Sequence, residues 1–337
     1  MNKKRALVIT SISSPNKAMK SFAEGALETG TDFWVIGDQR SPKEFNLEGC
    51  RFVSLEKQLK CGFSFGINCP TGHYSRKNIG YILAMQAGAE VIIDTDDDNL
   101  PYESFWNKRE ALVQAACIKT AGWCNIYRYF TNKMIWPRGL PLEHIKDMPA
   151  RLEDLPVESI YCPIQQGLAN SNPDVDAIFR LAFDLPFDFD NPDLEIILGG
   201  SAWCPFNSQN TQWFKPAFPL LYLPSYCSFR MTDIWRSFVA KRICAENNWG
   251  VLFHGSTVWQ ERNDHDLIKD FSDELPGYTN NSKIANTLEN LDLKPGVESI
   301  PENMKKCYSV LCRNNFIQDK ELVLLDSWLQ DIDSTTS

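Results

Sequence analysis

The chain has 337 residues, of which 43% are hydrophobic, and its 43 acidic and 34 basic side chains give a formal charge of −9. This length allows one large or two modest domains with a sizeable core. The acidic balance argues against a nucleic-acid partner or an anionic membrane surface, because either favours a basic face. No apolar stretch approaches the ~18 residues of a membrane-spanning helix. Eleven cysteines without a C-x-x-C spacing suggest reduced core thiols, so we expect a cytoplasmic protein.

The first hundred residues alternate between strand and helix signals. Short apolar runs predict strands at Arg5–Thr10, Phe33–Gly37, Phe52–Leu55 and Val91–Ile93. Apolar residues at helical spacing predict helices at Lys17–Glu28 and Tyr74–Ala87. This alternation predicts a mostly parallel α/β sheet with helices on its faces.

The remainder of the chain has less regular signals. Residues 137–175 are rich in Pro, Glu and Asp, which predicts loops or an insertion, and four prolines interrupt residues 197–229. Further on, the patterns predict a helix at Met231–Asn247, a strand at Trp249–His254, and helices at about 264–274, 282–290, 302–314 and 319–331. The residues after Asp331 are expected to fray.

An acidic run follows the fourth predicted strand directly, as Asp94-Thr95-Asp96-Asp97-Asp98. Open α/β sheets bind ligands at the carboxyl ends of their strands. A divalent cation would offset the repulsion between these carboxylates, and oxygen ligands suit Mg²⁺ or Mn²⁺. Alternation along an extended segment would point Asp94, Asp96 and Asp98 to one side, so two or three carboxylates are expected at one metal. The alternative is a solvated acidic loop.

Two basic residues, Arg76 and Lys77, lie at the start of the helix that precedes this strand. A helix N-terminus favours anions, and a guanidinium fork beside an ammonium suits a diphosphate. The alternative is a solvated basic pair.

The best helical pattern of the second half opens with Arg230-Met231-Thr232-Asp233-Ile234-Trp235-Arg236. Asp233 and Arg236 are three positions apart and can touch. We interpret Asp233 as a carboxylate base held by Arg236, with Trp235 as an aromatic platform at the mouth of a pocket. The alternative is a capped helix with an ion pair.

Two histidines lie at element ends. His254 closes a predicted strand, where a third metal ligand or a phosphate donor would come from, although a lone histidine is more often structural. His265 lies at an expected helix start.

Two polar stretches suit a hydroxyl-rich ligand. One is residues 206–211, which include Asn207, Gln209 and Asn210, and the other is residues 172–180, which include Asp174 and Asp176. The alternative for the first stretch is a turn.

Several of these blocks together resemble the STELLO-like family of glycosyltransferase-related proteins. The blocks are KNIGYILAMQAGAEVIIDTDDDN, PDVDAIFRL, CPFNSQNTQWF, FRMTDIWRSFVAKR and HGSTVWQERNDHDLIKDF, in order from about residue 75 to 275. The acidic run followed by D-x-W is also loosely similar to the reversibly glycosylated polypeptides, which act as UDP-arabinopyranose mutases. The sequence departs from the plant STELLO pattern because it has no membrane anchor, which favours a soluble enzyme over Golgi residence.

The resemblance implies an α/β GT-A fold. It implies a catalytic domain over residues 1–275, in which residues 1–100 bind the nucleotide sugar and residues 101–275 bind the acceptor, and a helical extension over residues 276–337. It places Asp96 and Asp98 at the metal, with His254 as a further candidate, and Asp233 as the base. The implied donor-binding residues are Arg76, Lys77, Asp94, Thr95, Asp96 and Asp97. The implied acceptor-binding residues are Asp174, Asp176, Asn207, Gln209, Asn210, Trp235 and Arg236.

The resemblance therefore predicts a Mn²⁺- or Mg²⁺-dependent glycosyltransferase. It would transfer a sugar from a nucleotide-diphosphate sugar, with UDP as the expected nucleotide, to a hydroxyl of a glycan or other acceptor, with inversion. Two alternatives stay open: a nucleotide-sugar mutase that uses the same donor site, and a non-catalytic scaffold with a relic glycosyltransferase fold.

Overall fold

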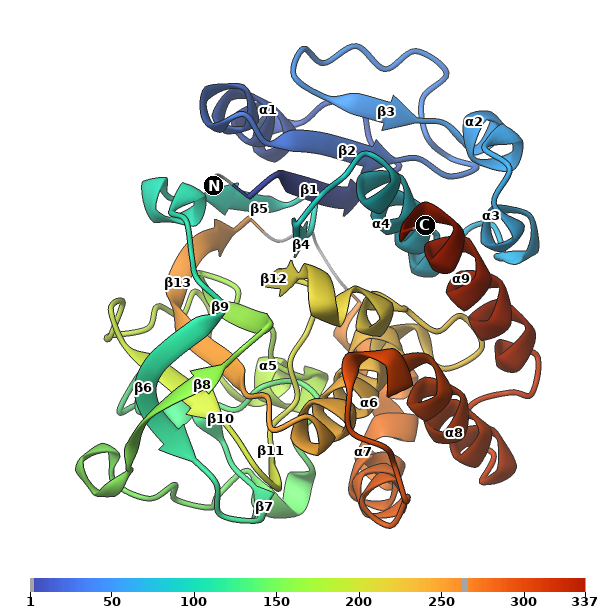
Figure 1. Ribbon diagram of the computed structural model, residues 1–337. Helices are drawn as coiled ribbons and strands as arrows, with labels where there is room; N and C mark the ends of the chain where they lie inside the picture. Colours follow the sequence, from blue (N-terminus) through green and yellow to red (C-terminus); the bar gives the residue numbers. More distant parts are fainter. Residues whose placement is uncertain (1–2, 262–265, 337) are drawn as a thin grey trace.

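The computed structural model describes residues 3–261 and 266–336 (Figure 1). His265 and the start of the helix predicted at 264–274 lie outside these residues. Within them, eleven strands form one mixed sheet, and β7 and β11 form a separate pair. The strands are β1 Arg5–Thr10, β2 Asp32–Ile36, β3 Arg51–Val53, β4 Val91–Thr95, β5 Asn99–Pro101, β6 Leu112–Ile118, β7 Gly122–Trp123, β8 Val157–Tyr161, β9 Ile164–Asn170, β10 Glu195–Leu198, β11 Ala202–Trp203, β12 Asn210–Phe214 and β13 Val251–Gln260. The helices are α1 Lys17–Thr29, α2 Leu55–Lys60, α3 Ser64–Asn68, α4 Lys77–Gln86, α5 Ala177–Ala182, α6 Thr232–Glu246, α7 Leu267–Glu289, α8 Ile300–Arg313 and α9 Glu321–Thr336.

The first four strands form the parallel part of the sheet in the order β3-β2-β1-β4. β1 is buried on both faces: Ala6 and Val8 belong to the large core shared with α4, and Leu7 and Ile9 pack under α1. Parallel strands buried on both faces have continuous apolar runs, which is why the sequence pattern located them. The predicted α/β class is confirmed.

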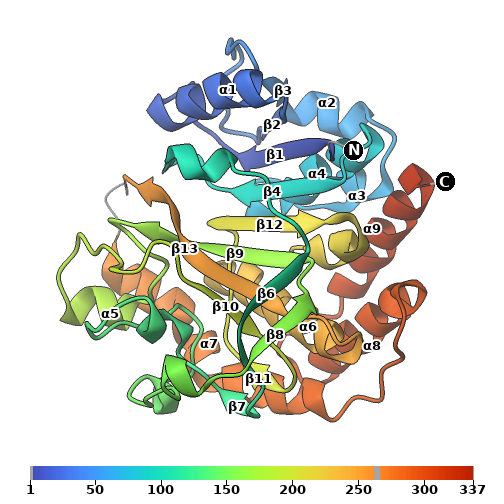
Figure 2. The same cartoon turned by 60° about the vertical axis from the view of Figure 1, so that its left-hand side comes forward.

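The second part of the sheet is mixed. β12 runs antiparallel to β4, and the order continues as β9-β13-β10-β6-β8, as Figure 2 shows. The prediction of loops or an insertion over residues 137–175 is wrong for residues 157–170, where β8 and the central strand β9 lie. The strands were hidden because buried polar residues, such as Gln165 and Gln166 of β9, break the apolar pattern.

The C-terminal helices are part of the main body. α9 packs against α3 and α4 of the first half (Figure 1). The carboxylate of Asp331 accepts the backbone N–H groups of Ser64 and Phe65. The predicted fraying after Asp331 is wrong, since this helix continues to Thr336. The expected boundary near residue 275 falls inside α7, which is continuous through Pro276. In the described part of the chain, no helix is both long and apolar enough to cross a membrane.

Candidate active site

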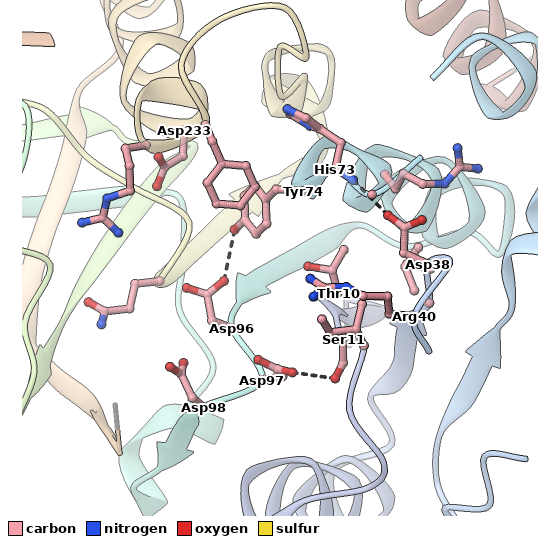
Figure 3. Close-up of a pocket in the computed structure, with 18 of the residues that line it drawn as sticks. Thr10, Ser11, Asp38, Arg40, His73, Tyr74, Asp96, Asp97, Asp98 and Asp233 are labelled. Carbon is pink, nitrogen blue, oxygen red and sulfur yellow. Dashed lines mark hydrogen bonds between the residues drawn. The ribbon is translucent and has the colours of Figure 1, made fainter. Parts of the chain in front are cut away.

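A cavity of about 460 Å³ opens at the carboxyl ends of β1, β2 and β4 (Figure 3). Its size is within the range of small-molecule sites. The first half of the chain lines it with Thr10, Ser11, Ile12, Ile36, Gly37, Asp38, Gln39, Arg40, Gly72, His73, Tyr74, Arg76, Asp96, Asp97 and Asp98. The second half adds Arg138, Asp174, Arg180, Gln209, Phe229, Arg230, Asp233 and Gln260.

The acidic run divides between the core and the cavity. β4 ends at Thr95, and the chain then turns, so that Asp96, Asp97 and Asp98 all line the cavity. The predicted alternation stops at the turn. Asp94 is fully buried and does not line the cavity, and Thr95 donates its hydroxyl to the carbonyl of Gln209. The expectation that Asp94 and Thr95 contact a donor is not supported.

The three cavity carboxylates have different surroundings. Asp96 accepts a hydrogen bond from the Tyr74 hydroxyl at 3.1 Å, Asp97 accepts one from the Ser11 hydroxyl, and Asp98 accepts one from the Gln260 amide at 2.9 Å. Burial raises the pKa of Asp96 to about 7, and Asp98 adds to the rise while Lys77 opposes it. Burial also raises the pKa of Asp97. Three carboxylates therefore share this wall of the cavity, and the buried Lys77 pairs with Asp96 at 3.3 Å.

We tested whether this wall fits a divalent cation. In residues 3–261 and 266–336, no group of three or more His, Cys, Asp or Glu side chains is arranged to hold a metal. Asp96 and Asp98 both line the cavity, and each repels the other's charge. Mg²⁺ is often held by one or two carboxylates, while water and substrate phosphates complete its shell. The pair fits a cation that binds together with a phosphorylated ligand.

His254 is separated from these carboxylates. It lies on β13, and β12 and β9 come between β13 and β4, a distance of about 14 Å at the usual strand spacing. Its Nδ1–H donates to the Gly255 carbonyl, and burial lowers the pKa of its imidazole to about 3. His254 is not a lining residue, and the expectation of a metal ligand at this position is wrong because β13 reaches the acidic run through Gln260, six residues further along the chain.

The basic pair at the start of α4 points inward. The guanidinium of Arg76 donates to the Gln58 side chain and to the carbonyls of Cys69 and Gly66, so its donors are used within the fold. The ammonium of Lys77 is fully buried and pairs with Asp94 at 2.7 Å. Arg76 is still a lining residue, but neither cationic group is free to bind a diphosphate, contrary to expectation.

Asp233 enters the cavity from the first turn of α6, as predicted. In Figure 3, Tyr74 lies between Asp233 and Asp96. The ion-pair partner of Asp233 is Arg138, whose Nη2 donates to both oxygens of the Asp233 carboxylate at 2.8 and 3.0 Å. The same guanidinium donates to Asp174 at 2.7 Å. Burial alone raises the pKa of Asp233, but the charge and hydrogen bonds of Arg138 outweigh it, so the pKa is lowered. The predicted contact with Arg236 is wrong.

Arg236 makes its direct contacts elsewhere, although its charge helps to lower the pKa of Asp233. Its guanidinium pairs with Asp94 at 3.0 Å, donates to the Ser208 hydroxyl and lies over the Trp213 ring. Trp235 is buried and donates to the Asn281 side chain, so it is not an exposed platform.

The polar stretches contribute fewer ligand-facing groups than expected. Asp174 and Gln209 line the cavity. Asp176 instead caps α5 and accepts the Trp136 indole N–H. Asn207 accepts the backbone N–H of Gln209, and Asn210 donates to the carbonyl of Leu168 and to the Thr257 hydroxyl. These three side chains are used within the fold.

Several cavity residues had not been predicted. Ser11 and Asp38 follow β1 and β2, so the rule that located the acidic run also applied to them. His73 donates its backbone N–H to Asp38. Arg138 comes from a segment without a periodic signal, and no feature of the sequence indicated its role.

Comparisons with known proteins give the following relationships. Residues 230–336 match the family model of the STELLO glycosyltransferases. The chain is 27% identical over 346 residues to the probable glycosyltransferase STELLO1 of Arabidopsis thaliana, and 27% identical over 345 residues to STELLO2 of the same plant. Each alignment covers 97% of this chain and 44% of the relative, so the chain spans less than half the length of these proteins. The predicted resemblance to the STELLO family is confirmed.

Among solved structures, a mycobacterial protein aligns at 9% identity with a TM-score of 0.40, over 94% of this chain and 76% of that chain. Glucosyl-3-phosphoglycerate synthase of M. tuberculosis aligns at 10% identity with a TM-score of 0.39, over 85% of this chain and 79% of that chain.

Proposed function

Starting from this likeness to the STELLO glycosyltransferases, we propose that the chain is a metal-dependent glycosyltransferase of the GT-A type. It would transfer a sugar from a nucleotide-diphosphate sugar, with UDP as the expected nucleotide, to a hydroxyl of a glycan or other acceptor. The observation that supports this most is one cavity that holds both the carboxylates at the end of β4 and the paired carboxylate of Asp233.

Asp96 and Asp98 are the residues proposed to hold Mn²⁺ or Mg²⁺. A bound cation would supply positive charge for the two phosphates of the donor as negative charge develops on the leaving nucleotide. The surroundings of Asp96 support this assignment, because its partly exposed carboxylate is repelled by Asp98 and has only a long 3.3 Å contact with Lys77, so it gains from a cation.

Asp233 is proposed as the base. Its lowered pKa keeps the carboxylate ionised at neutral pH, and Arg138 fixes its orientation. As the acceptor hydroxyl attacks the anomeric carbon, its proton passes to Asp233. The bond between that carbon and the diphosphate oxygen breaks, and its electron pair leaves with the nucleotide. One such displacement inverts the anomeric carbon.

Phe229, in place of Trp235, is proposed as the aromatic platform of the cavity. Its side chain is 55% exposed, lines the cavity and rests edge-on against His73 and Tyr74. An exposed ring within a polar cavity offers an apolar face to a sugar ring of the acceptor. Asp174 and Gln209, which also line the cavity, are proposed to bind its hydroxyls.

Calorimetric titration of UDP in the presence of Mn²⁺ tests the donor site. Asp96→Ala and Asp98→Ala are expected to lose metal-dependent binding while they stay folded. Asp193→Ala, which removes an exposed carboxylate, is the matched control and should bind as the wild type does. Unchanged binding in either cavity variant would refute the metal assignment. A screen of nucleotide sugars for slow, metal-dependent hydrolysis then identifies the donor without knowledge of the acceptor.

A further inference from the structure

Asp94 lies at the centre of a buried triad of charges, although it belongs to the acidic run. Its Oδ1 pairs with the Lys77 ammonium at 2.7 Å, and its Oδ2 pairs with the Arg236 guanidinium at 3.0 Å. All three side chains are at most 1% exposed. Both carboxylate oxygens are therefore engaged with cations of the protein, and Asp94 is not available to an external ligand.

Lys77 lies between two carboxylates. Its ammonium is 2.7 Å from Asp94 and makes a longer hydrogen bond of 3.3 Å to Asp96. It also donates to the Thr95 carbonyl and the Tyr74 hydroxyl. Asp94 is the closer partner. Coulomb attraction falls as 1/r, so at these distances Lys77 attracts Asp94 about 1.2 times as strongly as Asp96, and its contact with Asp96 is the weaker of the two.

Arg236 keeps Asp94 in this position. It reaches Asp94 from α6, and its second terminal nitrogen donates to the Ser208 hydroxyl at 2.8 Å. Its guanidinium lies 4.9 Å above the Trp213 ring. A guanidinium restrained on three sides holds its carboxylate partner in one orientation.

We propose that Asp94 is a positioning residue that draws the Lys77 ammonium toward itself, so that the contact of Lys77 with Asp96 stays long and Asp96 can bind a divalent cation. The inference rests on the proposed metal site, and it assigns the first carboxylate of the run a role other than that of a ligand. Lys77 acts on the same site in the opposite sense, as an internal cation that competes for Asp96.

The roles proposed for Asp94 and Lys77 predict opposite changes in Mn²⁺ affinity for two variants, each of which loses the Lys77–Asp94 ion pair. Asp94→Asn leaves Asp96 as the only carboxylate partner of Lys77, so the affinity for Mn²⁺ in the presence of UDP should fall about tenfold. Lys77→Met removes the competing ammonium, so Mn²⁺ should bind more tightly than in the wild type. Lys60→Met removes an exposed lysine paired with Glu56, and should leave the affinity unchanged.

Electron paramagnetic resonance of free Mn²⁺ measures these affinities without an activity assay. A purely structural role for the triad predicts weaker binding in both variants, and that result would overturn the proposal. Should Asp94→Asn not fold, the sign of the change in Lys77→Met decides alone, because tighter binding supports the competition and weaker binding contradicts it.

A metal-free measurement separates this inference from the proposed function. If the wild type binds no Mn²⁺ with UDP, the metal site fails. The crystal structure of Asp94→Asn without metal then tests the positioning role alone. We expect the contact between the Lys77 ammonium and Asp96 to shorten, and an unchanged 3.3 Å separation would contradict the positioning role.

Discussion

Replacement of Arg138 by glutamine should lower the free energy of unfolding and shift the acidic limit of activity to higher pH. Its guanidinium bonds Asp233 at 2.8 Å and Asp174 at 2.7 Å, and all three side chains are at most 12% exposed. Arg138→Gln leaves the buried carboxylate of Asp233 and the half-buried carboxylate of Asp174 without their ion-pair partner. Breaking a buried ion pair costs about 3–5 kcal/mol, which is a large share of the 5–15 kcal/mol typical of a folded domain.

The pH dependence follows from the pKa of Asp233. Arg138 lowers this pKa below the ordinary value of 3.8, so the pair stabilises the folded state above about pH 3.8 and the contribution is lost as the pH falls through the lowered value. Without Arg138, only the charge of Arg236 and the Ser208 backbone hydrogen bond oppose burial, so the pKa of Asp233 should rise. The acidic limb of the activity profile should therefore move to higher pH by about 1–3 units.

Urea unfolding and the pH profile of nucleotide-sugar hydrolysis measure the two effects. Arg151→Gln is the matched control, because Arg151 also bridges two carboxylates, Glu153 and Asp154, but on the surface. The control should lose no more than about 1 kcal/mol and keep the wild-type profile. If Arg138→Gln lost no more than the control and its acidic limb stayed in place, the reasoning about Asp233 would be wrong.

Three further predictions concern single residues. Asp233→Asn should keep UDP binding by calorimetry but lose about 10²- to 10⁴-fold in transfer rate; full transfer activity would exclude it as the base. Phe229→Ala should lower transfer to a sugar acceptor by up to about tenfold while hydrolysis of the donor is unchanged, and equal losses in both assays would count against the platform. Burial lowers the pKa of Lys241 from 10.5 to about 8, so between these pH values the folded state binds fewer protons than the unfolded chain. The free energy of unfolding of the wild type should therefore rise across this window by up to about 3 kcal/mol relative to Lys241→Met. Parallel curves for the wild type and this variant, from urea unfolding at several pH values, would contradict the burial of a charged lysine.

Local signals determined much of the fold and part of the site. The parallel strands have continuous apolar runs because both their faces are buried, and the acidic run follows β4 without a break. Asp233 lies in the first turn of its helix, as the pattern predicted. By contrast, the sequence pattern did not predict β9 and β12, because several of their buried side chains are polar. Hydrogen bonds inside the sheet allow these side chains to be buried.

Only the tertiary structure decided which charges face the ligand. Arg138 lies 95 positions before Asp233, and Asp94 lies 142 positions before Arg236, so no spacing in the sequence relates these partners. Lysines and arginines next to a predicted anion site look alike in a sequence whether they face solvent or core. Lys77 and Arg236 face the core, because each is buried beside Asp94. A buried charge is stable only with an opposite charge at hydrogen-bond distance, and the fold brings that partner to it.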